Sequence, residues 1–142
     1  MTTPQLSMLK PGEILPALEI PITATQIVSG ALASQDFEDV HHDKAAANGK
    51  GTPDIFMNIL TTNGLVGRYL TDWAGPQSSI QRIKLSLGVP NFPGDCMVLS
   101  GAVVSIEDAV VEVSFKGKNG LGNHVSGSAW LQLPTSPEQE ND

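Results

Sequence analysis

The stretch that decides the fold is DIFMNILTTNGLVGRYLTDWAG, residues 54–75. Its apolar residues recur at intervals of three and four, the period of a helix with one apolar face. They are Ile55, Phe56, Ile59, Leu60, Val66, Tyr69, Leu70 and Trp73. Pro53 and Asp54 suit the start of a helix, where a carboxylate faces unpaired amides, and Gly75-Pro76 suits its end. The sequence therefore predicts one long helix from about Asp54 to Gly75.

Strand patterns follow this helix as far as Pro134. They cover residues 79–89, 96–106, 109–118 and 124–134. Val111, Val113 and Phe115 alternate with polar residues, as expected where one face of a sheet is buried and the other is wet. Before the helix, the short apolar run QIVSGALA, residues 26–33, also predicts a strand.

A short strand, a long helix and four antiparallel strands predict a single α+β domain over residues 25–134. In this arrangement, called the hot dog fold, an antiparallel sheet wraps around a central helix. Prolines at positions 4, 11, 16 and 21 predict an extended lead-in over residues 1–24. Residues 135–142 include three acidic residues and no large apolar side chain, so the sequence predicts a disordered acidic tail.

Charge and composition exclude several classes of partner. The net charge of -7 argues against nucleic acids and anionic membranes, because no basic field attracts phosphate polymers. The single cysteine, Cys96, cannot form an internal disulfide. No run reaches membrane-spanning length and no export signal is evident, so the sequence predicts a cytoplasmic protein.

The acidic stretch ASQDFEDVHHDKAAANG, residues 33–49, holds the candidate chemistry. Four residues separate Asp36 from His41, and a carboxylate and an imidazole that converge on one water can orient it and accept its proton. Amides at the start of the following helix can stabilise a developing enolate. A metal site at Asp39, His42 and Asp43 is the alternative, but no paired cysteines or helical histidine pair supports it. We expect no metal.

Five blocks in order resemble the MaoC-like, R-specific enoyl-CoA hydratases: DFEDVHHD, DIFMNILT, GLVGRYLTDWAGP, LGVP and LGNHV. Within that family they resemble the small-subunit type of the actinobacterial steroid side-chain hydratase. The resemblance spans residues 29–133. It implies addition of water to a trans-2-enoyl-CoA to give the 3-hydroxyacyl-CoA, with no cofactor besides the coenzyme A of the substrate.

The resemblance also implies roles for particular residues. Asp36 and His41 match the hydratase dyad, a backbone amide near Met57 and Asn58 matches the donor to the thioester carbonyl, and Thr62 matches a supporting position on the helix. Met57-Asn58 stands where the family commonly has His-Gly. Unlike glycine, Asn58 has a side chain that must turn away or act as a donor.

Several alternatives stay open. Arg82, Lys84, Lys116 and Lys118 are candidate contacts for the phosphates of coenzyme A, or ordinary surface cations. The resemblance implies a larger MaoC-like partner in an α2β2 assembly, and a homodimer is the alternative. Besides the hydratase, the chain could be a non-catalytic acyl-CoA-binding subunit or an acyl-CoA thioesterase.

Overall fold

The computed structural model describes residues 3–135 and contains five strands, three α-helices and two short 3-10 helices. In chain order they are η1 (Leu6–Met8), β1 (Ile14–Pro21), α1 (Ala24–Ala33), η2 (Asp39–His41), α2 (Lys44–Gly49), α3 (Ile59–Ala74), β2 (Ser79–Leu87), β3 (Cys96–Glu107), β4 (Val110–Asn119) and β5 (Gly122–Gln132). None of the described helices combines the length and apolar character needed to cross a bilayer. Apart from Thr135, the predicted tail lies outside the described residues.

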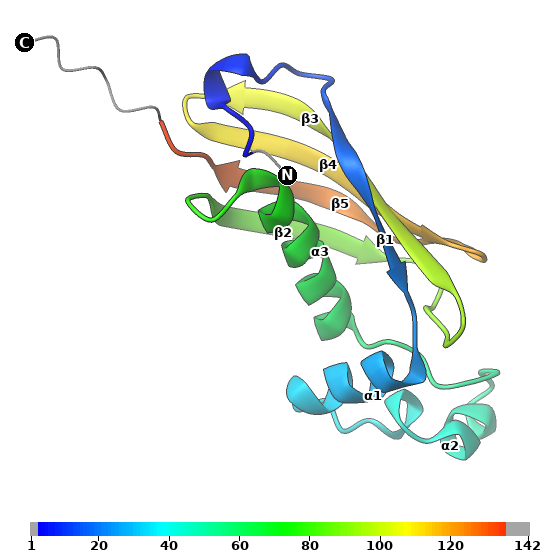
Figure 1. Ribbon diagram of the computed structural model, residues 1–142. Helices are drawn as coiled ribbons and strands as arrows, with labels where there is room; N and C mark the ends of the chain where they lie inside the picture. The colour runs from blue at the N-terminus through cyan, green and yellow to red at the C-terminus, as the bar shows by residue number, and fades with distance from the viewer. Residues whose placement is uncertain (1–2, 136–142) are drawn as a thin grey trace, which may run out of the picture.

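The five strands form one antiparallel sheet in the order β1-β3-β4-β5-β2. Figure 1 shows α3 lying along one face of this sheet, with α1 and α2 beyond its N-terminal end. The hot dog architecture predicted from the sequence is confirmed. The four strands predicted after the helix are confirmed too, as β2 to β5.

Strand β4 shows why the sequence alternates. Val111, Val113 and Phe115 are buried against α3, whereas Ser114 and Lys116 are exposed on the opposite face. Since successive side chains of a strand point to opposite faces, this pattern fixes which side of the sheet carries the core.

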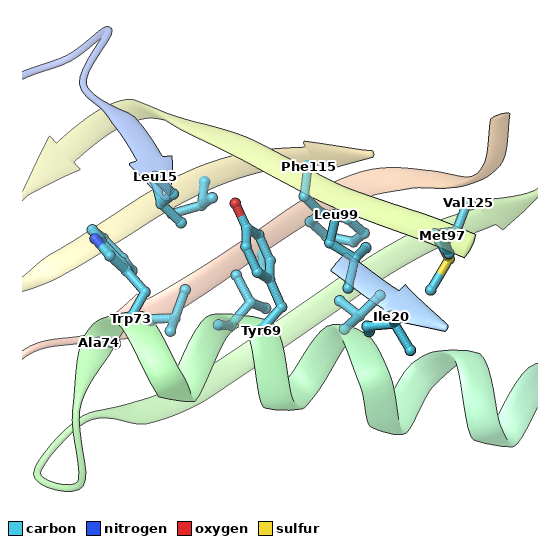
Figure 2. Packing of buried hydrophobic residues seen from close by; sticks show 14 of the residues in the cluster. Leu15, Ile20, Tyr69, Trp73, Ala74, Met97, Leu99, Phe115 and Val125 are labelled. Carbon is cyan, nitrogen blue, oxygen red and sulfur yellow. The ribbon is translucent and has the colours of Figure 1, made fainter. Parts of the chain in front are cut away.

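Helix α3 supplies the other half of the core. Its buried side chains are Thr62, Val66, Tyr69, Leu70, Trp73 and Ala74. Figure 2 shows Tyr69 and Trp73 projecting from the helix towards the sheet, where Leu15, Leu99 and Phe115 meet them. The helix ends at Gly75 as predicted, and the positive φ of 87° at this residue suits glycine.

The predicted start of this helix at Asp54 is wrong. Helix α3 begins at Ile59, and Asn58 is its N-cap, with the side-chain oxygen accepting from the amide of Thr61 at 3.1 Å. The preceding segment is held outside the helix by hydrogen bonds from the Phe56 amide to Val40 and from the Met57 amide to Asn91. The apolar spacing continues before the helix, to Ile55 and Phe56, but tertiary hydrogen bonds keep this segment out of the helix.

The strand predicted over residues 26–33 is wrong as well, because this segment belongs to α1. The Thr23 hydroxyl caps the helix by accepting from the amide of Gln26, and Ile27 and Ala31 are buried four residues apart. A short apolar run does not distinguish a buried strand from a helix.

The sheet also includes part of the stretch predicted as a lead-in. Strand β1 pairs with β3, for example Ile20 with Met97. Its place at the edge of the sheet tolerates Pro16 and Pro21, which cannot donate to a second neighbour. Residues 14–21 are thus extended, as predicted, but as a strand of the domain.

Candidate active site

The candidate site lies where the end of α1, the loop after it and the start of α3 meet, beyond one end of the sheet (Figure 1). The chain leaves α1 through Ser34, whose hydroxyl donates to the Gly30 carbonyl at 2.8 Å. Gln35 then adopts a positive φ of 57°, which turns the backbone sharply. This turn presents Asp36 towards the start of α3.

The structure brings Asp36 and His41 together. Their facing atoms, Oδ2 of Asp36 and Nε2 of His41, are 3.4 Å apart. The Nδ1–H of His41 donates to the carbonyl of Phe56 at 2.7 Å, and the rings of these two residues pack edge to face. This hydrogen bond orients the imidazole so that Nε2 is the nitrogen that faces the carboxylate.

Asp36 is held as a carboxylate by its neighbours. Asn58 donates from Nδ2 to Oδ2 at 3.0 Å, and the Glu38 amide donates to Oδ1 at 3.4 Å. The hydrogen bond from Asn58 is the main reason why the pKa of Asp36 is lowered, the Glu38 amide and His41 act in the same direction, and partial burial opposes them. At neutral pH the pair thus presents an ionised carboxylate beside an oriented imidazole.

Of the two amides near which the thioester donor is predicted, that of Met57 donates to the carbonyl of Asn91 at 3.1 Å. The side chain of Asn58 is likewise committed, since it caps α3 and binds Asp36. The predicted donor to a thioester carbonyl is then the backbone amide of Asn58, and this role stays a prediction.

Thr62 faces the core and not the dyad. Its hydroxyl is fully buried and lies 2.8 Å from Nε2 of His124, whose Nδ1–H donates to the Val89 carbonyl at 2.7 Å. Burial lowers the pKa of His124, although the hydrogen bond to Val89 acts in the opposite direction. A neutral His124 accepts from the Thr62 hydroxyl, so these residues join α3 to β5.

This buried histidine predicts a pH dependence of stability. Because the pKa of His124 is lowered in the folded state, the unfolded chain takes up the proton first as pH falls below about 6.5. The free energy of unfolding should therefore fall below this pH, by at most about 1.4 kcal/mol per pH unit from this group. Urea titrations of the parent and of His124→Gln between pH 8 and 5 measure the difference.

The exposed His42 provides the control for that comparison. His42→Gln should keep the parent's pH dependence, whereas His124→Gln should flatten it. If the free energy of unfolding changed with pH equally in the parent and in His124→Gln, the prediction would be contradicted.

The four candidate cations lie on the outer face of the sheet, away from α3. Arg82 stacks over the ring of Trp130 at 5.2 Å, and Lys84 pairs across from Ser128. Lys116 and Lys118 occupy the exposed positions of β4. None of the four contacts the dyad in the described part of the chain, and their role towards coenzyme A stays a prediction.

Two other acidic residues of the loop, Asp39 and Asp43, have structural partners. Asp39 pairs with Lys50 at 2.7 Å, and Asp43 caps α2 by accepting from the amide of Ala46. Within residues 3–135 no group of three potential ligands is placed to hold a metal ion. Asp39 and Asp43 therefore make local contacts within the loop and α2, away from the dyad.

Two open depressions lie around this part of the chain, and Asp36 lines the first of them. One is lined by residues 35–39, and the other runs between α1 and α3 past Gly30, Ser34, Leu60 and Leu65. Phe37 is 68% exposed and Leu60 51% exposed, unusual values for such large apolar side chains. Phe37 therefore provides exposed apolar surface next to the Asp36 carboxylate.

Sequence reasoning missed two parts of this site, the hydroxyl of Ser34 and the carbonyl of Phe56, and left open whether the Asn58 side chain turns away or acts as a donor. The Asn58 side chain alone left a signal, because asparagine is one of the preferred N-cap residues of helices. The other two contacts join segments distant in the sequence and have no local pattern.

Comparisons with known proteins give a consistent result. No family model matches the chain. The chain is 47% identical over 125 residues to the beta subunit of 3-oxo-4,17-pregnadiene-20-carboxyl-CoA hydratase from Mycobacterium tuberculosis, covering 88% of this chain and 97% of that protein.

Solved structures agree in fold. A chain in the crystal structure of the ChsH1-ChsH2 complex from M. tuberculosis is 46% identical, with a TM-score of 0.87 over 89% of this chain and all of that one. The (R)-hydratase from A. caviae involved in PHA biosynthesis is 22% identical, with a TM-score of 0.82 over 89% of this chain and 98% of that one. At this low identity the second likeness supports the fold only.

Proposed function

This chain belongs to the MaoC-like hydratase family, and we propose that it is the catalytic small subunit of an enoyl-CoA hydratase. The observation that carries the proposal is the facing pair of Asp36 and His41 beside the start of α3. The predicted cytoplasmic location and the absence of a cofactor other than substrate-borne coenzyme A belong to the same proposal.

The geometry supports addition of water to a trans-2-enoyl-CoA. A water bound between Oδ2 of Asp36 and Nε2 of His41 gives up a proton to one of them while its oxygen bonds to the β-carbon. The electron pair of the double bond moves to the thioester, and the resulting enolate oxygen is stabilised by the amide at the start of α3. The α-carbon then takes the proton, which balances the addition and yields the 3-hydroxyacyl-CoA.

We further propose a bulky acyl group of the steroid side-chain type as the substrate. The similar protein from M. tuberculosis carries a pregnadiene carboxyl-CoA in its name. Phe37 follows Asp36 directly, and Leu60 lines the depression between α1 and α3; these exposed side chains fit a large apolar acyl group better than a short polar one.

A larger MaoC-like partner in an α2β2 assembly completes the proposal. The similar chain was crystallised as the ChsH1-ChsH2 complex. Leu32, near the end of α1, and Ile59, at the start of α3, are about half exposed in the isolated chain, and a partner would remove them from water.

The test is an activity assay of the chain alone and co-purified with the candidate partner. We expect loss of enoyl-thioester absorbance without release of free thiol, and faster turnover in the complex, with steroid-derived enoyl-CoA preferred over crotonyl-CoA. Thiol release would identify a thioesterase. Binding of acyl-CoA without conversion in either preparation would identify a non-catalytic subunit.

A further inference from the structure

Asn58 lies between the dyad and helix α3 with its side chain fully used. It is 2% exposed. Its Oδ1 accepts from the amide of Thr61 at 3.1 Å and also from the Thr61 hydroxyl. Its Nδ2 donates to the Ser34 hydroxyl at 2.9 Å and to Oδ2 of Asp36 at 3.0 Å.

The helix cap fixes which way the Asn58 amide points. A backbone N–H can only donate, so the atom facing the Thr61 amide must be the oxygen. The NH2 group is thereby directed at Asp36 and Ser34. Helix formation and the orientation of the carboxylate are thus set by one side chain.

We propose that Asn58 is a positioning residue that holds the Asp36 carboxylate against His41 and ties it to the first turn of α3. The same oxygen of Asp36 that accepts from Asn58 faces Nε2 of His41 at 3.4 Å. The segment before α3 also supplies the Phe56 carbonyl that orients His41. Both members of the dyad are therefore hydrogen-bonded to residues at, or just before, the start of α3.

This role explains why a residue other than glycine occupies the helix start. Glycine can serve as an N-cap, but it has no side chain to donate to Asp36. Because a hydrogen bond to an ionised group is stronger than a neutral one, its loss frees the carboxylate and makes the ionised form less favourable.

The test uses Asn58→Ser, in which serine keeps a capping hydroxyl but lacks the amide donor. This proposal rests on the proposed hydratase function, so the expected decrease in kcat/KM of about ten- to a hundredfold, mostly in kcat, applies to hydration. The acidic limb of the pH–rate profile should move to higher pH. Carbon-13 NMR of the Asp36 carboxyl should show its titration midpoint rising.

Thr23→Ala is the matched control, because it removes the N-cap of α1 without a contact to Asp36. This variant should keep the parent's pH profile and Asp36 titration even if it is less stable. Asn58→Asp, which is isosteric, places a second carboxylate beside Asp36 and should raise the Asp36 midpoint further.

The two proposals fail in different ways. If the parent shows no hydration, the NMR titration still decides: a midpoint raised in Asn58→Ser supports the positioning role. A folded Asn58→Ser protein with the parental Asp36 midpoint overturns it, whatever the activity. With an active parent, an unchanged pH profile in Asn58→Ser overturns it as well.

Discussion

Replacing Asp36 with asparagine should lower kcat/KM for enoyl-CoA hydration by about three orders of magnitude, within the range for loss of a general acid or base. The variant keeps the size of the side chain and one carbonyl oxygen for the Asn58 donor, but it loses the negative charge beside His41. His41→Ala should lose a similar factor. The double variant should be little slower than either single one, because the two groups act on the same water.

The controls for this experiment lie in the same loop. His42 is exposed, and Asp39 pairs with Lys50 and not with the dyad. His42→Ala and Asp39→Asn should therefore hydrate within a few-fold of the parent. Steady-state assays on the assembled complex, with circular dichroism to show folding, make the comparison. A folded Asp36→Asn protein with parental kcat/KM would remove the dyad from the mechanism.

Long periodic segments of this fold could be predicted from the sequence. Helix α3 is sixteen residues long and has one buried stripe, and buried and exposed positions alternate without interruption along β4. Short segments could not be predicted in this way. The apolar pattern of residues 26–33 fits a strand and a helix equally well. The segment forms a helix whose N-cap is Thr23.

The dyad could be predicted, but its setting could not. Asp36 and His41 lie in one local stretch, so a pattern of two residue types identifies them. The contacts that orient them come from Phe56 and Asn58, which are 15 and 22 residues away from their partners in the sequence. The packing of α1 against both α3 and η2 brings those segments together.

The pairing of β2 with β5 depends on Gly127, a residue that no sequence pattern identifies. Gly127→Ala in β5 should destabilise the protein by about 3 kcal/mol or more, at the upper end for point substitutions. A Cβ at this position would lie 2.0 Å from the Lys84 carbonyl oxygen and 2.8 Å from Cα of Leu85. These are backbone atoms of β2, so relief requires β2 to move away from β5 and lose its ladder.

Gly67→Ala in α3 is the opposite case and the matched control. A Cβ there meets no atom within 4 Å, and alanine is the better helix former, so stability should rise by about 0.5 to 1 kcal/mol. Urea denaturation of both variants measures the contrast. Equal stability of Gly127→Ala and the parent would mean that β2 shifts at no cost. A loss of stability in Gly127→Ala together with a gain in Gly67→Ala would instead show that position 127 requires glycine because a Cβ does not fit there. The same substitution is favourable at position 67, where a Cβ has room.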